Sequence, residues 1–262
     1  MAPAMTYLRV GTKGLRVISH LLVGLLLPIL VIFNGRGRCS RENLATWWHR
    51  VLLRILDIKL VVSGTPLVGT KVMVCNHISW LDIPVVAACE ATRFVSKAEV
   101  GEWPVIGWLA DAAGTFYLRR GSGGTKQLIE AIDEHLGRDS IVFFPEGTTT
   151  DGTIVLKFQP RLFATAIETK RPVQPIALRF SPAADGTVTA PYVGDDVLLD
   201  NIIRLLKHGA ITAEIIYCAP IDPEGHDRAS LAHAAHTAIC TAIAPDSIRP
   251  AKSRDDRDAI AA

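Results

Sequence analysis

Cysteine is scarce in this sequence, and its cysteines form no recognisable ligand or disulfide pattern. Only five of the 262 residues are cysteine, and they are widely scattered with no Cys-x-x-Cys pair. This odd, scattered set argues against a disulfide framework and a zinc knuckle, and it indicates a reducing compartment. His233, His236 and Cys240 would share one helical face, but no acidic or cysteine partner stands at structural-zinc spacing, so we expect no metal.

A strong excess of charge is also absent. The 28 Lys and Arg residues nearly balance the 26 Asp and Glu residues, which gives a formal charge of +2, and no aromatic residues interleave with cationic runs. Nucleic acid is therefore not an expected partner. The chain has no Gly-x-Ser-x-Gly elbow, and its glycine run at 121–124 lacks the Gly-Lys-Ser/Thr ending of a P-loop, so we interpret this run as a loop before a helix.

Apolar residues are abundant instead, with 49% of the chain hydrophobic and a mean hydropathy of +0.27. Residues 17–33 carry no fixed charge and reach the lower end of the roughly 17 to 25 residues that span a bilayer. Three basic residues precede this run, but 34–38 is a poor cleavage site for a signal peptide, which favours an uncleaved membrane anchor. Pro28 and the basic residues at both ends leave a half-inserted or monotopic hairpin open.

The next segment, 42–58, has apolar residues at helical spacing opposite basic ones and includes Trp47 and Trp48. It predicts an amphipathic helix that either docks on a membrane with the preceding segment or packs on the folded domain. We expect three regions: an N-terminal membrane anchor with this helix at 1–58, an α/β domain at 59–244, and a disordered tail at 245–262.

Short β-branched runs alternate with helical patterns through the middle of the chain, which predicts an α/β fold with a mostly parallel mixed sheet flanked by helices. The expected strands are 59–62, 72–75, 93–96, 114–118, 140–144, 173–179 and 211–217. The expected helices are 83–91, 125–136, 158–168, 198–206 and 228–243. The aromatic segment 103–109 would line an acyl pocket or belong to the core.

The stretch from Cys75 to Asp82 is the predicted reaction centre. His77 follows the carboxyl end of the strand at 72–75, which is the edge where open α/β sheets bind ligands. Ser79 is placed to cap the next helix, and the spacing allows the Asp82 carboxylate to fold back onto one ring nitrogen of His77. The other nitrogen would then face the cleft as a general base.

Two other interpretations of this stretch remain open. A thioesterase would use Cys75 as nucleophile, although adjacent residues of a strand point to opposite faces, which separates Cys75 from His77. A non-catalytic membrane scaffold would use these polar residues only to satisfy backbone groups at a strand-to-helix turn. If the pair is a base without a nucleophile, the attacking hydroxyl belongs to a substrate.

Four stretches in order along the chain resemble the motifs of the glycerolipid acyltransferase family, which includes the 1-acylglycerol-3-phosphate acyltransferases. They are Asn76 to Asp82, the family's His-x-x-x-x-Asp block; Gly114 to Arg120; Phe144 to Thr148; and Val173 to Ile176. Each is common alone, but all four together at predicted strand ends form a specific signal.

The resemblance implies transfer of a fatty acyl group from a thioester to a lipid hydroxyl, without a cofactor because a thiol is already a good leaving group. The implied site residues are His77 and Asp82 for catalysis, and Lys97, Arg120, Glu146, Gly147 and Thr148 for substrate binding. In this scheme His77 is the general base and Asp82 orients it. Arg120, helped by Lys97, binds an anionic head group of the acceptor.

The acceptor implied first is 1-acyl-glycerol-3-phosphate, with acyl carrier protein or coenzyme A carrying the donor. The expected location is the cytoplasmic membrane, with the catalytic domain on its cytoplasmic side. Many family members carry Arg after the Glu-Gly-Thr motif, whereas this chain has Thr149, Thr150 and Asp151. The threonine-rich form resembles the branch with lyso-ornithine lipid acyltransferases, so lyso-ornithine lipid is the alternative acceptor.

Overall fold

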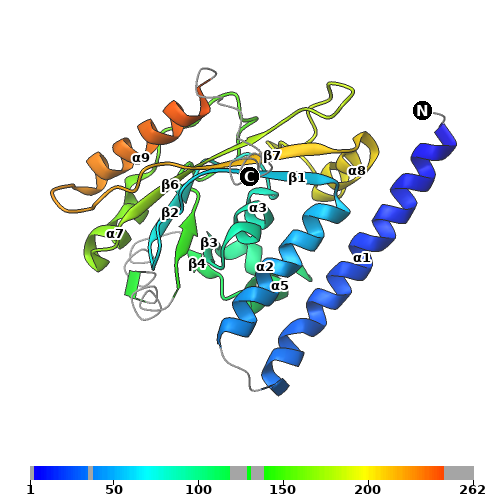
Figure 1. The fold of residues 1–262 in the computed structure, drawn as a ribbon, viewed down its shortest axis with the longest axis horizontal. Coiled ribbons are helices and arrows are strands. Elements are labelled where there is room, and N and C mark those ends of the chain that lie inside the picture. Colours follow the sequence, from blue (N-terminus) through cyan, green and yellow to red (C-terminus); the bar gives the residue numbers. More distant parts are fainter. Residues whose placement is uncertain (1–2, 35–37, 119–128, 131–138, 245–262) are drawn as a thin grey trace, which may run out of the picture.

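A seven-stranded sheet runs through the centre of the protein in a computed structural model that describes residues 3–34, 38–118, 129–130 and 139–244 (Figure 1). The strands lie in the order β1-β7-β6-β2-β5-β3-β4. Their bounds are β1 Ile58–Gly64, β2 Val72–Cys75, β3 Arg93–Lys97, β4 Phe116–Leu118, β5 Ile141–Phe143, β6 Val173–Phe180 and β7 Ile211–Tyr217. Every pair of neighbours is parallel except β6 and β7. The predicted mostly parallel mixed sheet is confirmed.

Helices cover both faces of this sheet (Figure 1). Their bounds are α1 Pro3–Asn34, α2 Arg38–Ile55, α3 Asp82–Cys89, α4 Ala98–Gly101, α5 Ile106–Ala112, a 3-10 turn Pro160–Phe163, α7 Ala164–Thr169, α8 Leu198–His208 and α9 Arg228–Ile243. Apolar side chains of α2, α3 and α8 pack on one face, and those of α7 and α9 pack on the other. The result is a three-layer α/β arrangement.

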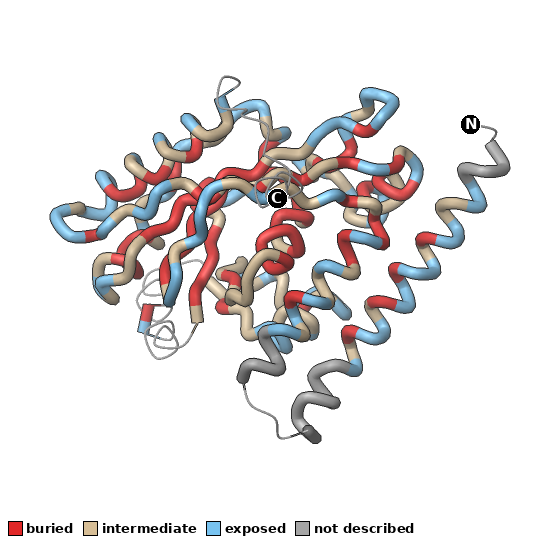
Figure 2. The backbone as a smooth tube through the Cα atoms, viewed as in Figure 1, coloured by how far each residue is buried: buried red, intermediate tan, exposed pale blue. Residues whose placement is uncertain are grey.

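Strand β2 lies at the centre of this arrangement. Met73 and Cys75 point into the core below α3, while Val72 and Val74 point into the core below α9. All four residues have no exposed surface, and the central strands in Figure 2 are correspondingly buried. A strand with both faces covered takes a continuous apolar run, and this is the pattern that identified it in the sequence.

The N-terminal helix α1 is one helix of 32 residues that packs along α2 and against α8 (Figure 1). Arg9 and Lys13 both pair with Asp57, and Val17 is buried in the core. Among the helices that the structure describes, none combines the length and the apolar character needed to cross a membrane. The membrane anchor predicted at 17–33 stays a prediction.

Segment 103–109 is not part of the core. Trp103, Val105 and Trp108 expose 43%, 42% and 42% of their surface in the described structure. Helix α5 lies beside α1 and beside Tyr117 of β4. Four predicted features fall wholly or mostly outside the described residues: the glycine loop at 121–124, the helix at 125–136, Arg120 and the tail at 245–262.

Candidate active site

His77 and Asp82 meet as the sequence predicts. Nδ1 of His77 lies 2.7 Å from Oδ2 of Asp82, whose side chain is fully buried, while 21% of the His77 side chain is exposed. An ionised carboxylate only accepts hydrogen bonds, so Nδ1 carries the ring proton and Nε2 is left as an acceptor. This is the tautomer that a general base requires.

The same carboxylate oxygen also builds the turn that carries His77. Oδ2 of Asp82 accepts from the backbone N–H of Ile78 at 2.7 Å and of Ser79 at 2.9 Å. The predicted cap by Ser79 is wrong, because α3 begins after Leu81 without a side-chain cap and the Ser79 hydroxyl has no partner in the described structure. The N–H of Asp82, which a cap at Ser79 would bind, donates instead to the backbone carbonyl of Ser79 at 3.1 Å.

Glu146, three residues after β5, holds the catalytic turn from the neighbouring strand. One oxygen of its carboxylate accepts from the backbone N–H of His77 at 2.6 Å. The other oxygen accepts from the backbone N–H of Leu156 at 2.7 Å. Burial raises the pKa of Glu146, and these two backbone donors partly oppose the rise. Glu146 therefore fixes the position of His77, and its expected contact with the acceptor stays a prediction.

The turn after Glu146 also binds the backbone of His77. The backbone N–H of Thr150 donates to the carbonyl of His77 at 2.9 Å, so both main-chain polar groups of the base are bound by this turn. Gly147 adopts a left-handed conformation with φ of 73°, and it and Thr148 are exposed. These two exposed residues are the part of the motif that is free to contact a substrate.

The remaining predicted binding residues have different outcomes. Lys97 ends β3, at the sheet edge that also holds His77 and Glu146, and it is exposed. Arg120 lies outside the described residues, so its role as the ligand of an anionic head group stays a prediction. The structure therefore brings His77, Asp82 and Glu146 into contact and places Lys97 at their edge of the sheet.

Cys75 is badly placed for nucleophilic attack. It is fully buried, and burial, with the nearby charges of Asp82 and Glu146, raises the pKa of its thiol well above the usual value. A protonated thiol without access is a poor nucleophile. By contrast, the His77 ring stacks on Phe144 with 4.2 Å between ring centroids, which leaves the imidazole edge open to a substrate.

Two contacts of the catalytic turn were not predicted from the sequence. The Trp80 indole N–H donates to the Asn201 side chain of α8 at 2.9 Å, and the backbone N–H of Tyr192 donates to Ile78 at 3.0 Å. Asn201 is fully buried and also donates to the carbonyl of Pro191. A polar residue buried in an amphipathic helix is the signal that would have pointed to this anchor.

His236 and Cys240 do share a helical face, with the Cys240 sulfur 3.6 Å from Nε2 of His236. His236 also contacts the carbonyl of Val155 at 3.2 Å. Neither contact involves His233, which is exposed. The pair therefore has a packing role beside the loop that follows the Glu146 motif.

The fold and this site define a class of α/β acyl-transfer enzymes, and comparison with known proteins agrees. Residues 62–179 match the Acyltransferase family model. The chain is 37% identical over 245 residues to a lyso-ornithine lipid O-acyltransferase of Pseudomonas aeruginosa, covering 91% of this chain and 95% of that protein. It is 32% identical over 217 residues to a 1-acyl-sn-glycerol-3-phosphate acyltransferase of Neisseria meningitidis, covering 80% and 85%.

The crystal structure of a 1-acyl-sn-glycerophosphate acyltransferase from Thermotoga maritima has the same fold, with a TM-score of 0.64 and 20% identity over 92% of this chain and all of that one. The chain belongs to the glycerolipid acyltransferase family and is an acyltransferase. The resemblance read from its four motifs is confirmed.

Proposed function

We propose that this protein moves a fatty acyl group from an acyl thioester to the free hydroxyl of a lyso-ornithine lipid. The choice of this acceptor rests on the 37% identity to the Pseudomonas aeruginosa lyso-ornithine lipid O-acyltransferase, which extends over nearly the full length of both chains. The His77 and Asp82 pair supports the chemistry, since it supplies a base and no nucleophile.

The reaction follows from the free nitrogen of His77. Nε2 removes the proton of the acceptor hydroxyl while its oxygen forms a bond to the thioester carbonyl carbon. The carbon–sulfur bond then breaks, and the thiolate takes the proton back from the imidazolium. Asp82 stabilises the charged ring during this exchange. The thiol belongs to acyl carrier protein or coenzyme A, and the products are the acylated lipid and the free carrier.

The residues after Glu146 favour an amino-acid lipid over a phosphate monoester. The Thr149 hydroxyl donates to the carbonyl of Tyr192, and the Thr150 hydroxyl donates to the carbonyl of Ile154 at 3.1 Å. Both side chains are committed to the backbone, and neither supplies the cation that many family members have at the first of these positions. A zwitterionic head group needs less positive charge than a phosphate monoester does.

1-Acyl-glycerol-3-phosphate is the second candidate, and its product would be phosphatidic acid. The observation in its favour is the 32% identity to the Neisseria meningitidis enzyme, together with exposed Lys97 at the active edge of the sheet. Under this assignment Lys97 and Arg120 would bind the phosphate.

A panel of acceptors tests the assignment. Purified enzyme is given lyso-ornithine lipid, lysophosphatidate and a neutral lysolipid, each with acyl carrier protein and coenzyme A donors, and the acylated products are measured by mass spectrometry. We expect the highest kcat/KM with lyso-ornithine lipid. Preference for lysophosphatidate would move the assignment to the second candidate, and no turnover of any acceptor would reject acyl transfer to lysolipids.

We further propose that α1 docks the enzyme on the cytoplasmic side of the membrane from which it takes its acceptor. The outward face of α1 is rich in exposed apolar side chains, and α5 next to it exposes Trp108, with Trp103 exposed in the turn before α5. Among the side chains of α1 that the structure describes, the exposed apolar ones are Tyr7, Leu8, Leu15, Ile18, Leu22, Val23 and Leu26. Such a face with interfacial aromatics suits a helix lying in the membrane surface. Free thiols in the described cysteines suit the reducing side.

A further inference from the structure

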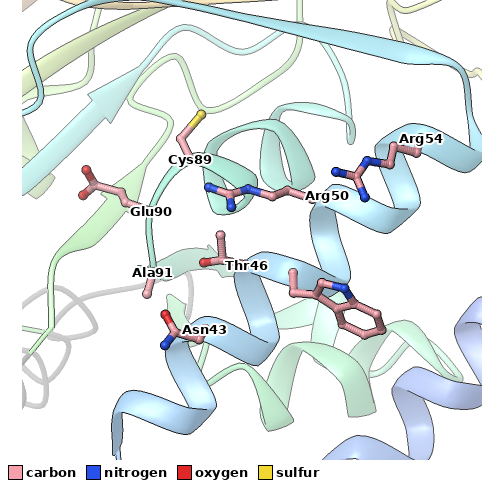
Figure 3. A pocket seen from close by; sticks show the side chains of 8 residues that line it. Asn43, Thr46, Arg50, Arg54, Cys89, Glu90 and Ala91 are labelled. Carbon is pink, nitrogen blue, oxygen red and sulfur yellow. The ribbon is translucent and has the colours of Figure 1, made fainter.

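A cavity of about 590 Å³ lies between α2 and the end of α3, away from the catalytic turn (Figure 3). It is lined by Asn43, Thr46, Trp47, Arg50 and Arg54 of α2 and by Cys89, Glu90 and Ala91 at the end of α3. The α2 residues recur at helical spacing, so they form one face of that helix. The volume is within the roughly 300 to 1,000 Å³ of small-ligand sites.

This cavity is separate from the catalytic centre. Helix α3 begins at Asp82, which contacts His77, and ends at Cys89, which lines the cavity. Eight helical residues span about 12 Å. A ligand in the cavity therefore does not occupy the place of the hydroxyl that Nε2 of His77 deprotonates.

The cavity carries positive charge that the described residues do not neutralise. Nε of Arg50 donates to the carbonyl of Ala88 at 2.7 Å, which fixes its stem at the end of α3 and leaves its terminal nitrogens without a hydrogen bond to any described residue. Arg54 is exposed and has no ion pair with any described residue. In Figure 3 both guanidinium groups extend from α2 over the cavity.

The single carboxylate in the lining does not cancel this charge. Glu90 is paired with Lys71 at 2.7 Å, and 4% of the Lys71 side chain is exposed. Figure 3 shows the Glu90 carboxylate turned away from Arg50 and Arg54. Two arginines one helical turn apart therefore face a space that suits an anion, and the planar guanidinium binds phosphate oxygens in a bidentate manner.

We propose that this cavity binds the phosphate of an anionic phospholipid of the membrane, at a site distinct from the acceptor site. The lipid source is favoured by Trp47, which lines the cavity and exposes 49% of its surface, and by the pairing of α2 with α1, the helix with the exposed apolar face. Tryptophan and arginine side chains gather at the head-group level of membranes. The site rests on the proposed membrane docking and would set how the enzyme is oriented on the lipid surface.

Binding of the full chain to vesicles tests this site. Flotation is measured with phosphatidylcholine vesicles and with vesicles that also contain phosphatidylglycerol. Arg54→Gln should weaken binding to the anionic vesicles by about fivefold, which is typical for one basic residue near such a surface, and should leave binding to phosphatidylcholine unchanged. Arg54→Lys should also bind the anionic vesicles more weakly. It keeps the positive charge but loses the planar guanidinium that binds two phosphate oxygens at once.

Arg228→Gln is the matched control, since Arg228 is exposed at the start of α9 on the other face of the sheet. An equal loss in Arg228→Gln, or wild-type binding by Arg54→Lys, would mean diffuse electrostatic attraction and would overturn the site. A different result would show that the ligand is free phosphate and not a lipid. In that case inorganic phosphate would bind tightly and depend on Arg54, while the protein would bind equally well to the two kinds of vesicle.

Turnover separates this proposal from the proposed function. Arg54→Gln should acylate detergent-dispersed lyso-ornithine lipid at the wild-type rate, because Arg54 lines this cavity and forms no hydrogen bond or ion pair with the catalytic turn among the described residues. A tenfold fall in that rate would place Arg54 in the acceptor or donor site and overturn the separate site. A wild-type enzyme without acyltransferase activity that still shows the Arg54-dependent vesicle binding would reject the proposed function and keep this site.

Discussion

One oxygen atom of Asp82 accepts from three groups: the His77 ring and the backbone N–H groups of Ile78 and Ser79. A single buried atom thus sets the tautomer of the base and the shape of the turn that presents it. Four residues separate His77 from Asp82, and this spacing allows Asp82 to orient the ring and to bind the turn. The chain completes the turn into α3 over these residues, so the carboxylate can reach back to His77.

Asp82→Asn should therefore lose activity. The amide oxygen can still face the three donors, but the side chain has no charge to stabilise the imidazolium, so kcat should fall by about 10² to 10⁴. The control is Cys75→Ser, which changes another buried polar group beside the turn and should keep most activity. Acyl transfer and circular dichroism are measured for both. An active Asp82→Asn enzyme, or an inactive but folded Cys75→Ser enzyme, would contradict the assigned roles.

Glu146 predicts a different kinetic signature. In Glu146→Gln one oxygen is replaced by an amide NH₂, which faces a backbone N–H of either His77 or Leu156 and leaves a buried donor unsatisfied. The free energy of unfolding should fall by about 1 to 3 kcal/mol. Because His77 is displaced, kcat should fall more than KM rises. Glu168→Gln, on the exposed side of α7, is the control. A rise in KM at constant kcat would instead assign Glu146 to acceptor binding.

At the scale of elements, the contact between α1 and α2 contains the buried His20 and the partly buried His49. The His20 ring stacks on Trp48 with 4.5 Å between centroids, and Nε2 of His20 and Nδ1 of His49 are buried without a hydrogen-bond partner in the described structure. Burial lowers the pKa of His20, and burial together with His20 lowers the pKa of His49 from 6.5 to about 4. Both rings are therefore neutral at the helix contact near pH 7.

Acid should weaken this contact. The unfolded chain binds a proton at His49 near pH 6.5 and the folded chain only near pH 4, so the stability from neutral His49 is present above pH 6.5 and is lost as the pH falls through that window. The loss amounts to at most about 3 kcal/mol. His49→Leu should flatten the dependence of unfolding free energy on pH, and His233→Leu, on the exposed side of α9, should not. Equal slopes for wild type and His49→Leu would contradict the assignment.

The outward face of α1 supports a second prediction at this scale. Replacing Leu15, Ile18 and Leu22 by Gln removes exposed apolar side chains and leaves the buried side of the helix intact, so folding should persist while binding to neutral vesicles falls. Val68→Gln, at a side chain that is 95% exposed, is the control. Vesicle sedimentation of the triple variant at the wild-type level would show that α1 is not the docking surface.

At the scale of the whole molecule, strands were easier to predict than contacts between segments. Every strand predicted from the sequence is present with its ends moved by no more than two residues. Central strands such as β2 are buried on both faces and form continuous apolar runs, while β7 alternates buried and half-buried residues. The His77 and Asp82 contact was also predictable, since it is local in the sequence. The link from Glu146 to the His77 backbone was not, because it joins strands that are neighbours only in the folded sheet.

Errors arose where the fold overrides a local preference. Ser79 is a good capping residue, but the backbone N–H of Asp82, which a capping hydroxyl would bind, donates to the Ser79 carbonyl instead, so the hydroxyl is left without that role. Segment 103–109 has the composition of a core, yet its tryptophans are exposed among the residues that the structure describes. Composition predicts whether a segment is apolar, but only the arrangement of the neighbouring elements decides whether it is buried or faces a membrane.

In the proposed mechanism, His77 is the base for acyl transfer to a lysolipid. The most direct measurement compares purified wild type and His77→Ala in the transfer of a labelled acyl group from a thioester to lyso-ornithine lipid, with thermal melting and vesicle binding recorded on the same samples. We expect the rate of acyl transfer to be lower by about 10² to 10⁴ in the variant. The melting temperature and vesicle binding should be close to those of the wild type. A folded His77→Ala enzyme that transfers acyl groups at the wild-type rate would contradict it.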